Sequence, residues 1–326
     1  MRTFALAAGA AALALALPAT AQDDAPAPPS PGEIAAAAPA TDWTAIAPED
    51  LLVMMLAPAP DGIERTVVIQ LMPAPFSQGW VENIRTLARA GWYDGISVNR
   101  VQDNYVAQWG DPNYDNPEAT GEAKPLPGGL RTMDEAAYVY PRSIDRPRAL
   151  DPLFWPPNDI HRWTSFHEGF PVAGVGTPDT ERNWPVHCYG TVGVGRGMSP
   201  DTGSGAELYT VIGHAPRHLD RNIAVVGRVI EGIEHLSSLP RGSGDLGFYT
   251  AEEAGKRTPI GSVRVAADLP AAEQPRFEYL STASDSFARY AEARANRRDP
   301  FFIVPAGGAD ICNITVPVRR ADEAGG

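Results

Sequence analysis

The sequence predicts a mainly β domain, built as a closed antiparallel barrel with helices packed at its openings. Gly (31) and Pro (32) together make up about 19% of the 326 residues, against about 12% in ordinary proteins, and both interrupt helices. The 44% of hydrophobic residues is enough for a substantial core. The order strand–strand–helix–strand, followed by further strands and a late helix, is typical of such a barrel.

The first 21 residues resemble a secretory signal peptide. Arg2 precedes an apolar run over residues 4–17, and the small residues Ala19-Thr20-Ala21 follow. The alternative is a membrane anchor, but the run is shorter than the ~20 residues that a span needs, and Asp23-Asp24 comes next. We therefore predict export to an oxidising compartment such as a bacterial periplasm. We predict no membrane span in the mature chain.

Pro- and Ala-rich residues 22–42 are predicted to form a flexible linker. The barrel domain is predicted over 43–265, with a C-terminal extension over 266–326. Residues 112–183 are rich in Pro and Gly and hold few periodic signals. This stretch is too long for an ordinary loop, which indicates a large insertion or a small subdomain.

Apolar runs with turn residues between them indicate the strands. The first two runs, separated by Pro58-Ala59-Pro60-Asp61-Gly62, are predicted to form a hairpin. The predicted strands cover residues 51–57, 65–72, 96–101, 104–108, 186–194, 208–213, 222–229, 246–250 and 260–265, with a further edge strand within 301–318.

Helical spacing predicts a helix over 76–90, with Trp80, Ile84, Leu87 and Ala88 on one face. Ser77 is the expected N-cap and Gly91 the expected stop. A short helix is predicted over 232–239 and an amphipathic one over 284–298. The first two would cap the barrel, and the third would belong to the extension.

Two cysteines, Cys188 and Cys312, are 124 residues apart. In an oxidising compartment they can form a disulfide that ties the C-terminal segment to the rest of the chain. Two buried free thiols are the alternative, because the sequence does not show the distance between them.

The net charge of −13 argues against nucleic acid as a partner, because a phosphate-binding face needs clustered cations. His214, His218 and Asp220 have metal-like spacing, but Pro216 prevents a helical arrangement of the two histidines, and a loop is favoured. The glycines at 193, 195 and 197 do not match a phosphate-binding loop. An exported hydrolase is also disfavoured, because Gly203-Ser204-Gly205 falls short of a nucleophile elbow.

Several segments, in the right order, resemble the cyclophilin-type peptidyl-prolyl isomerases. The resemblance covers roughly residues 50–111 and 184–240. It is carried by Val81-Glu82-Asn83-Ile84, by Tyr93-Asp94-Gly95, by the Arg–aromatic–Gln spacing of residues 98–111, by Gly190–Arg196, by Ala206–Tyr209 and by His218–Asn222.

This resemblance implies a cyclophilin-like barrel that catalyses cis–trans isomerisation of X–Pro bonds without metal or cofactor. Arg100 and Gln108 would be the catalytic residues. The residues implied to bind substrate are Val98, Asn99, Tyr105, Val106, Gly195, Arg196, Glu207, Tyr209, His218 and Leu219. If 98–101 is a regular strand, Arg100 and Val98 share one face. The partners would be proline-containing unfolded or folding polypeptides.

Some positions depart from the family pattern. Asn99 stands where the family has His, Trp109 where it has Gly, and Glu207 where it has Gln. Tyr105 and Tyr209 replace Phe, and a phenol in an apolar pocket needs a hydrogen-bond partner. A non-catalytic module that binds proline-containing peptides, or acts as a chaperone, is therefore the alternative function.

Overall fold

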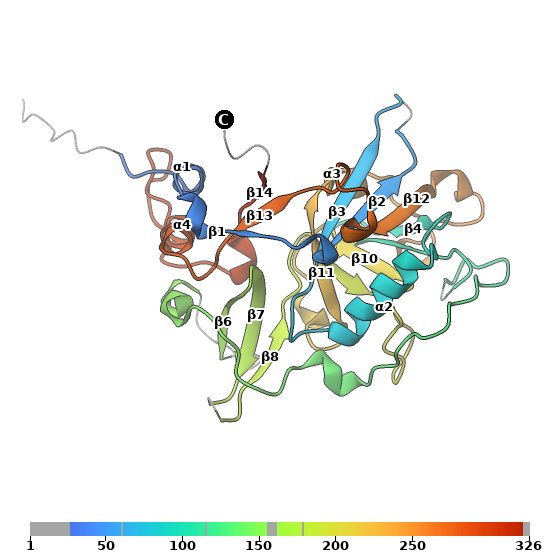
Figure 1. The fold of residues 1–326 in the computed structure, drawn as a ribbon, viewed down its shortest axis with the longest axis horizontal. Helices are drawn as coiled ribbons and strands as arrows, with labels where there is room; N and C mark the ends of the chain where they lie inside the picture. The colour runs from blue at the N-terminus through green and yellow to red at the C-terminus, as the bar shows by residue number, and fades with distance from the viewer. Residues whose placement is uncertain (1–26, 60, 115, 155–161, 178, 322–326) are drawn as a thin grey trace, which may run out of the picture.

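The computed structural model describes residues 27–59, 61–114, 116–154, 162–177 and 179–321. The predicted signal peptide lies outside the described residues. Eight strands form a closed antiparallel barrel, which confirms the predicted fold class (Figure 1). The order around it is β10-β5-β4-β12-β2-β3-β11-β9, and β9 pairs with β10 to close it. These strands are β2 (Leu51–Leu56), β3 (Arg65–Leu71), β4 (Ser97–Val101), β5 (Val106–Gly110), β9 (Thr191–Val194), β10 (Leu208–Val211), β11 (Val225–Glu231) and β12 (Thr258–Val265).

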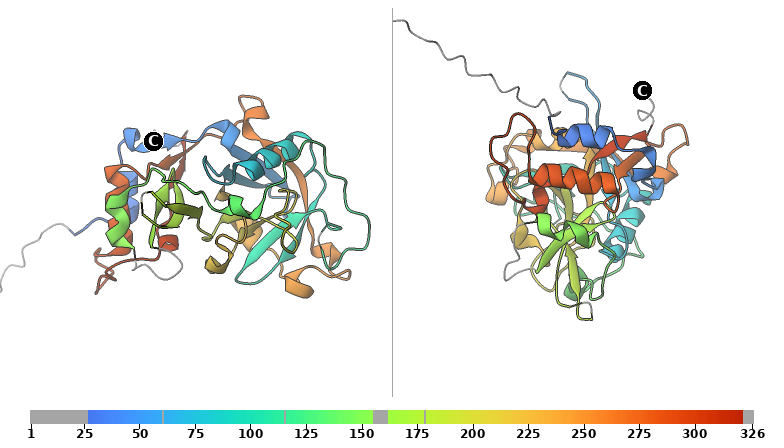
Figure 2. Two further views of the ribbon diagram at one scale, coloured as in Figure 1. Left: turned by 90° about the horizontal axis from the view of Figure 1, so that it is seen from below. Right: turned by 90° about the vertical axis from the view of Figure 1, so that its left-hand side faces the viewer.

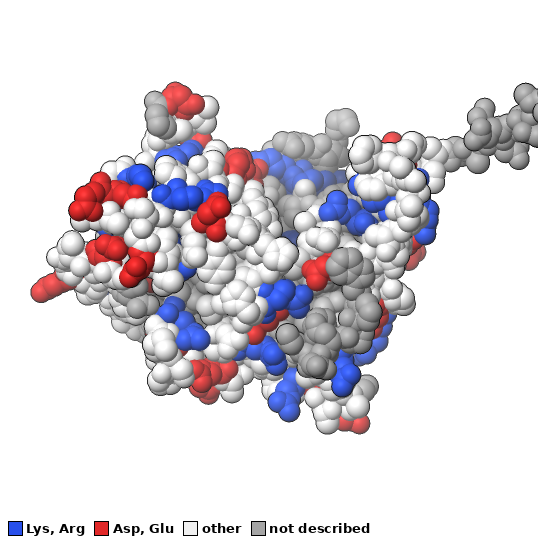
Figure 3. Space-filling model, turned by 180° about the vertical axis from the view of Figure 1, so that it is seen from behind, with Lys and Arg blue, Asp and Glu red and all other residues white. Residues whose placement is uncertain are grey.

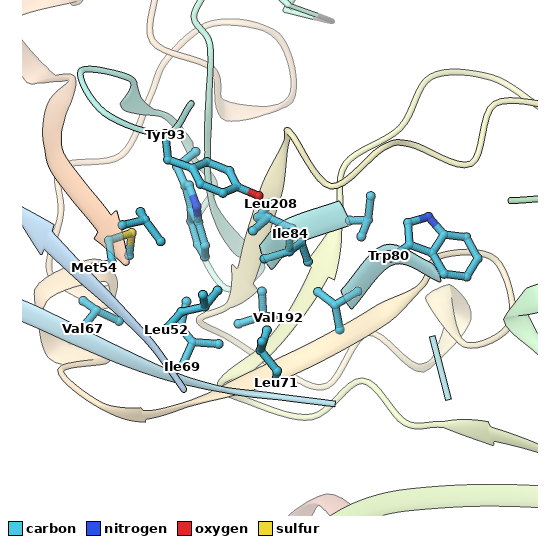
Figure 4. Close-up of a cluster of buried hydrophobic side chains, with 14 of the residues drawn as sticks. Leu52, Met54, Val67, Ile69, Leu71, Trp80, Ile84, Tyr93, Val192 and Leu208 are labelled. Carbon is cyan, nitrogen blue, oxygen red and sulfur yellow. The ribbon is translucent and has the colours of Figure 1, made fainter. Parts of the chain in front are cut away.

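The barrel interior is filled by branched and aromatic side chains. The predicted hairpin forms from β2 and β3, paired from Leu51–Gln70 to Leu56–Arg65. Leu52, Met54 and Ile69 of this hairpin meet Val192 and Leu208 of the opposite strands in the core (Figure 4). Alternation along each strand therefore sends one set of residues inward and leaves the other set for the outer face.

Helix α2 (Gln78–Arg89) covers the barrel, as predicted, and buries Trp80, Ile84 and Leu87 in the core. The indole Nε1 of Trp80 donates to the carbonyl of Gly203 at 3.0 Å. Ser77 occupies the N-cap position, as predicted, but it has φ 55° and its side chain makes no capping hydrogen bond. The short α3 (Glu234–Ser237) adds Leu236 to the same core.

A second core lies outside the barrel, at the left-hand end of Figure 1 and of the left view in Figure 2. It combines α1 (Pro31–Ala36), α4 (Asp285–Ala295) and a sheet of β1 (Trp43–Ala45), β13 (Phe277–Leu280) and β14 (Val318–Arg320). A further sheet comes from the predicted insertion and consists of β6 (Trp163–His167), β7 (Phe170–Val175) and β8 (Arg182–Pro185). Phe166 of β6 meets Phe287 of α4 edge to face at 5.0 Å. Three segments that are far apart in the sequence therefore share one core.

The prediction of a flexible linker is wrong for residues 30–42. Ser30 and Glu33 form a capping box that starts α1, with Pro31 in its first turn. α1 then packs on α4. The Ala-rich composition that suggested a linker belongs to a helix. The helix on which it packs lies more than 240 residues further along the chain.

Two predicted strands are also wrong. Residues 246–250 form a turn instead, with Leu246 at φ 55° and Gly247 at φ 83°. Within 301–318 only Val318 is in a strand, because residues 301–307 are exposed and have no pairing partner among the described residues. The strand β13 was not predicted, since it is short and follows a polar stretch.

Among the described residues, no helix combines the length and the apolar character needed to cross a bilayer. Acidic and basic side chains are interspersed over the barrel end of the face in Figure 3, at its left. The exclusion of nucleic acid as a partner stays a prediction from the net charge.

The cysteines form a disulfide, Cys188–Cys312, with the Cα atoms 5.1 Å apart. Cys188 directly precedes the loop into β9, and Cys312 belongs to the C-terminal extension. The bond therefore joins the extension to the barrel.

We expect removal of this bond to lower the free energy of unfolding by about 2–4 kcal/mol, because it closes a long loop in the unfolded chain. Denaturant unfolding of Cys188→Ser/Cys312→Ser against wild type measures the difference. Reductant should destabilise the wild type and leave the double variant unchanged. Equal sensitivity of both proteins to reductant would contradict the expectation.

Candidate functional site

A groove of about 650 Å³ runs along the outside of the barrel. It brings together eight of the predicted site residues with side chains from two loops that the sequence analysis did not assign to the site. The lining residues are Arg100, Tyr105, Val106, Gln108, Asn113, Asn116, Pro117, Gly195, Arg196, Gly197, Met198, Tyr209, Leu219, Ile223, Leu246 and Phe248.

The position of Arg100 depends on a bulge in β4. Val98 pairs with Trp109 and Arg100 with Gln108, so Asn99 has no partner in the β5 ladder. The extra residue reverses the alternation, and both Val98 and Val101 point into the barrel core. The prediction that Val98 shares a face with Arg100 is therefore wrong. Among the residues of β4, only Arg100 lines the groove.

Three oxygen atoms fix the guanidinium of Arg100. Nε donates to the Leu246 carbonyl at 2.7 Å, Nη1 to Gln108 Oε1 at 3.1 Å and Nη2 to Gln102 Oε1 at 2.5 Å. All three acceptors are neutral, and no carboxylate of the described residues forms an ion pair with this side chain. The full positive charge therefore remains available to a ligand in the groove.

Aromatic rings flank the same guanidinium. Its central carbon lies 5.6 Å from the ring centroid of Tyr105 and 5.5 Å from that of Phe248. Burial lowers the pKa of Arg100 from its usual value, and an arginine remains charged at neutral pH despite such a shift. The result is a cation held at the edge of an apolar surface, where its field is weakly screened.

An apolar wall of the groove is built from β5, β10 and the turn after residue 216. Val106 and Tyr209 are buried, and Leu219 and Ile223 complete the wall. Burial raises the pKa of Tyr209 well above 10, so the phenol is neutral. Its hydroxyl finds a partner outside the groove, in Nε2 of the buried His187 at 3.0 Å.

The sequence comparison agrees with this arrangement. The family described as cyclophilin type peptidyl-prolyl cis-trans isomerase/CLD matches residues 66–265, more than half of the chain. The chain belongs to this family.

One solved cyclophilin structure shows the same fold. Cyclophilin AquaCyp293 from Hirschia baltica is similar with a TM-score of 0.59 and 20% identity, over 85% of this chain and 94% of that one. A Cryptosporidium parvum cyclophilin type isomerase, in a crystal structure in the presence of the dipeptide Ala-Pro, is more distant. Its TM-score is 0.36 and its identity 10%, over 66% and 97% of the two chains. A comparison with curated proteins finds no match.

Four of the residues that the cyclophilin resemblance implicated do not line the groove. Val98 lies in the core, and Asn99 is buried with its amide donating to the Gly110 carbonyl at 2.9 Å. Glu207 is buried against Gly110, where a glycine leaves room for its carboxyl group. His218 is exposed at the rim, where it stacks on Tyr105 with the ring centroids 6.1 Å apart.

Asp220, which the metal-like spacing grouped with His214 and His218, points elsewhere. Its carboxylate is buried and accepts from His187 and Arg217. The part of the chain that the structure describes contains no group of three His, Cys, Asp or Glu side chains arranged around a common point.

Sequence reasoning missed the second wall of the cyclophilin groove. Leu246 and Phe248 come from the loop predicted as a strand, and Asn113, Asn116 and Pro117 come from the start of the insertion. An isolated bridge between Arg100 and Phe248 holds the loop beside β4. The apolar residues at 246 and 248 were visible in the sequence, but their spacing matched a strand equally well.

Gly193 of β9 leaves the space that the Tyr209 ring occupies in the groove wall. A Cβ at this position would lie 2.4 Å from both Cζ and the hydroxyl of Tyr209. We expect Gly193→Ala to lower the free energy of unfolding by about 1–3 kcal/mol and to weaken ligand binding in the groove, because the ring must move. Thermal or denaturant unfolding measures the first effect.

Gly261→Ala on β12 is the matched control, since its nearest neighbour would be 3.6 Å away, an ordinary contact. Equal stability of the two variants would contradict the expectation.

Proposed function

We propose that this chain is a peptidyl-prolyl cis–trans isomerase that acts on X–Pro bonds of exported polypeptides, by stabilising the twisted imide through Arg100. The observation that carries the proposal is a charged guanidinium, bound only by neutral acceptors, at the edge of an apolar groove. Membership of a family named for this reaction supports the reaction class.

The reaction needs few chemical groups. Rotation about the X–Pro bond must cross a barrier of about 18–20 kcal/mol, because the amide loses its conjugation. In the twisted state the prolyl nitrogen regains a lone pair, which accepts a hydrogen bond that the planar amide does not accept. A donor that interacts more strongly with the twisted state than with the planar one lowers the barrier. Neither a nucleophile nor a proton transfer is required.

Arg100 fits this role because a guanidinium carries five N–H donors and no acceptor. Gln108 and Gln102 hold two of its nitrogens, and the Leu246 carbonyl holds the third. The planar group is therefore oriented before a peptide arrives, and little of its binding energy is lost in ordering it. In this proposal the proline ring lies against Val106, Tyr209 and Leu219.

We expect Arg100→Ala to reduce kcat/KM for a proline peptide by about 10²-fold or more, the usual cost of removing one preorganised donor from a transition state. Arg100→Lys should keep only a minor part of the rate, because an ammonium lacks the planar fork. A protease-coupled or NMR exchange assay measures the rate.

The matched control is Arg131→Ala, which removes an arginine that is 62% exposed and paired with Glu82 on α2. This variant should keep the wild-type rate. Peptide binding with no acceleration by the wild type would favour a non-catalytic peptide-binding or chaperone module, and the isomerase proposal would then fail.

We also propose that the protein acts in the periplasm. The N-terminal pattern of residues 1–21 supports export, and the disulfide between Cys188 and Cys312 fits an oxidising compartment. We expect the exported protein to begin at Gln22. N-terminal sequencing of protein from the periplasmic fraction tests this, and an intact Met1 or Arg2 there would contradict cleavage.

A further inference from the structure

A chain of buried polar contacts lies directly behind the groove. Tyr209 contributes its ring to the groove wall, but its hydroxyl is bonded to His187 Nε2 at 3.0 Å. On the other side of the imidazole, Nδ1 lies 2.9 Å from Asp220 Oδ1. Arg217 Nε donates to the second carboxylate oxygen at 2.7 Å. His187 is fully buried and does not line the groove.

The hydrogen-bond chemistry fixes the direction of this chain. A carboxylate only accepts, so Nδ1 of His187 must carry the proton that it shares with Asp220. In the neutral ring Nε2 is then an acceptor, and the Tyr209 hydroxyl donates to it. The backbone N–H of His187 also donates to Asp220 Oδ1, at 2.9 Å, which fixes the imidazole relative to its own main chain.

As a consequence, Tyr209 presents an apolar surface to the groove, although its side chain carries a hydroxyl group. The hydroxyl end of Tyr209 lies over Gly193 and turns away from the groove toward His187. Without Nε2, the buried hydroxyl would have no acceptor there, and an unsatisfied buried polar group is costly. The ring would turn to find a new partner, and the wall against which the ligand packs would change shape.

We propose that His187, oriented by Asp220, is a positioning residue that holds the Tyr209 ring as the wall of the peptide groove. The proposal rests on the proposed function, since the ligand is a proline-containing peptide. His187 touches no ligand itself. It acts on KM rather than kcat, because the wall contacts the planar and the twisted peptide alike.

Two substitutions at His187 separate its two contacts. The amide nitrogen of Asn can replace Nδ1 and keep the bond to Asp220, whereas no atom replaces Nε2. The amide oxygen of Gln reaches the position of Nε2 and can still accept from Tyr209. We expect His187→Asn to raise KM for an X–Pro peptide about three- to tenfold with kcat within twofold, and His187→Gln to restore most of the loss.

The same measurement in a Tyr209→Phe background decides the mechanism. With no hydroxyl present, His187→Asn should add no further change in KM beyond that of Tyr209→Phe alone. His167→Asn is the matched control: this histidine is also buried and bonded through both ring nitrogens, to the carbonyls of Asp145 and Ala74, but it does not line the groove. It should lower stability and leave KM unchanged.

The outcomes distinguish the two proposals. A wild-type protein that does not accelerate isomerisation overturns the proposed function, whether or not it binds the peptide. An active wild type in which His187→Asn and His187→Gln behave alike, or in which the Asn effect persists undiminished beside Tyr209→Phe, overturns the positioning role alone. Imidazole ¹⁵N shifts of the wild type check the proton on Nδ1 without any substrate, and a protonated Nε2 in the neutral ring would also overturn it.

Discussion

The bulge at Asn99 is the constraint on which the site depends. A regular strand would carry Arg100 on the same face as Val98, and that face is the barrel core. A guanidinium cannot be buried there without partners, because desolvating a charge costs far more than one hydrogen bond returns. One additional residue in β4 turns Arg100 to the outside while Val98 and Val101 both remain in the core.

A second requirement comes from the polar groups beside the apolar groove. Each of them needs a hydrogen-bond partner that leaves the groove open. For Arg100 the partners are neutral oxygens of Gln102, Gln108 and Leu246, which fix the guanidinium without cancelling its charge. For Tyr209 the partner is the buried His187. The groove therefore combines an apolar wall with the oriented cation of Arg100, which is the combination that the proposed isomerase reaction requires.

The second core contains segments that lie outside the family match, before residue 66 and after residue 265, together with the sheet of the insertion, which lies within the match. Residues before the barrel, the sheet inside the insertion and the C-terminal helix form one apolar cluster beside the barrel. The cluster is joined to the barrel by the disulfide at Cys188, the residue next to His187. Arg217, which orients Asp220, also lies 3.8 Å from Asp310 of the extension. The extension is thus in contact with the residues that support the groove wall.

The sequence by itself determined the barrel, because the alternating apolar runs and the helix over 78–89 are local patterns that a core requires. Its resemblance to the cyclophilin family also singled out Arg100, Gln108 and Tyr209. Only the tertiary structure decided the direction in which β4 presents Arg100, the partner of the Tyr209 hydroxyl and the helix formed by the supposed linker. Each of these depends on contacts between separate segments of the chain, and such contacts leave no periodic signal in any one segment.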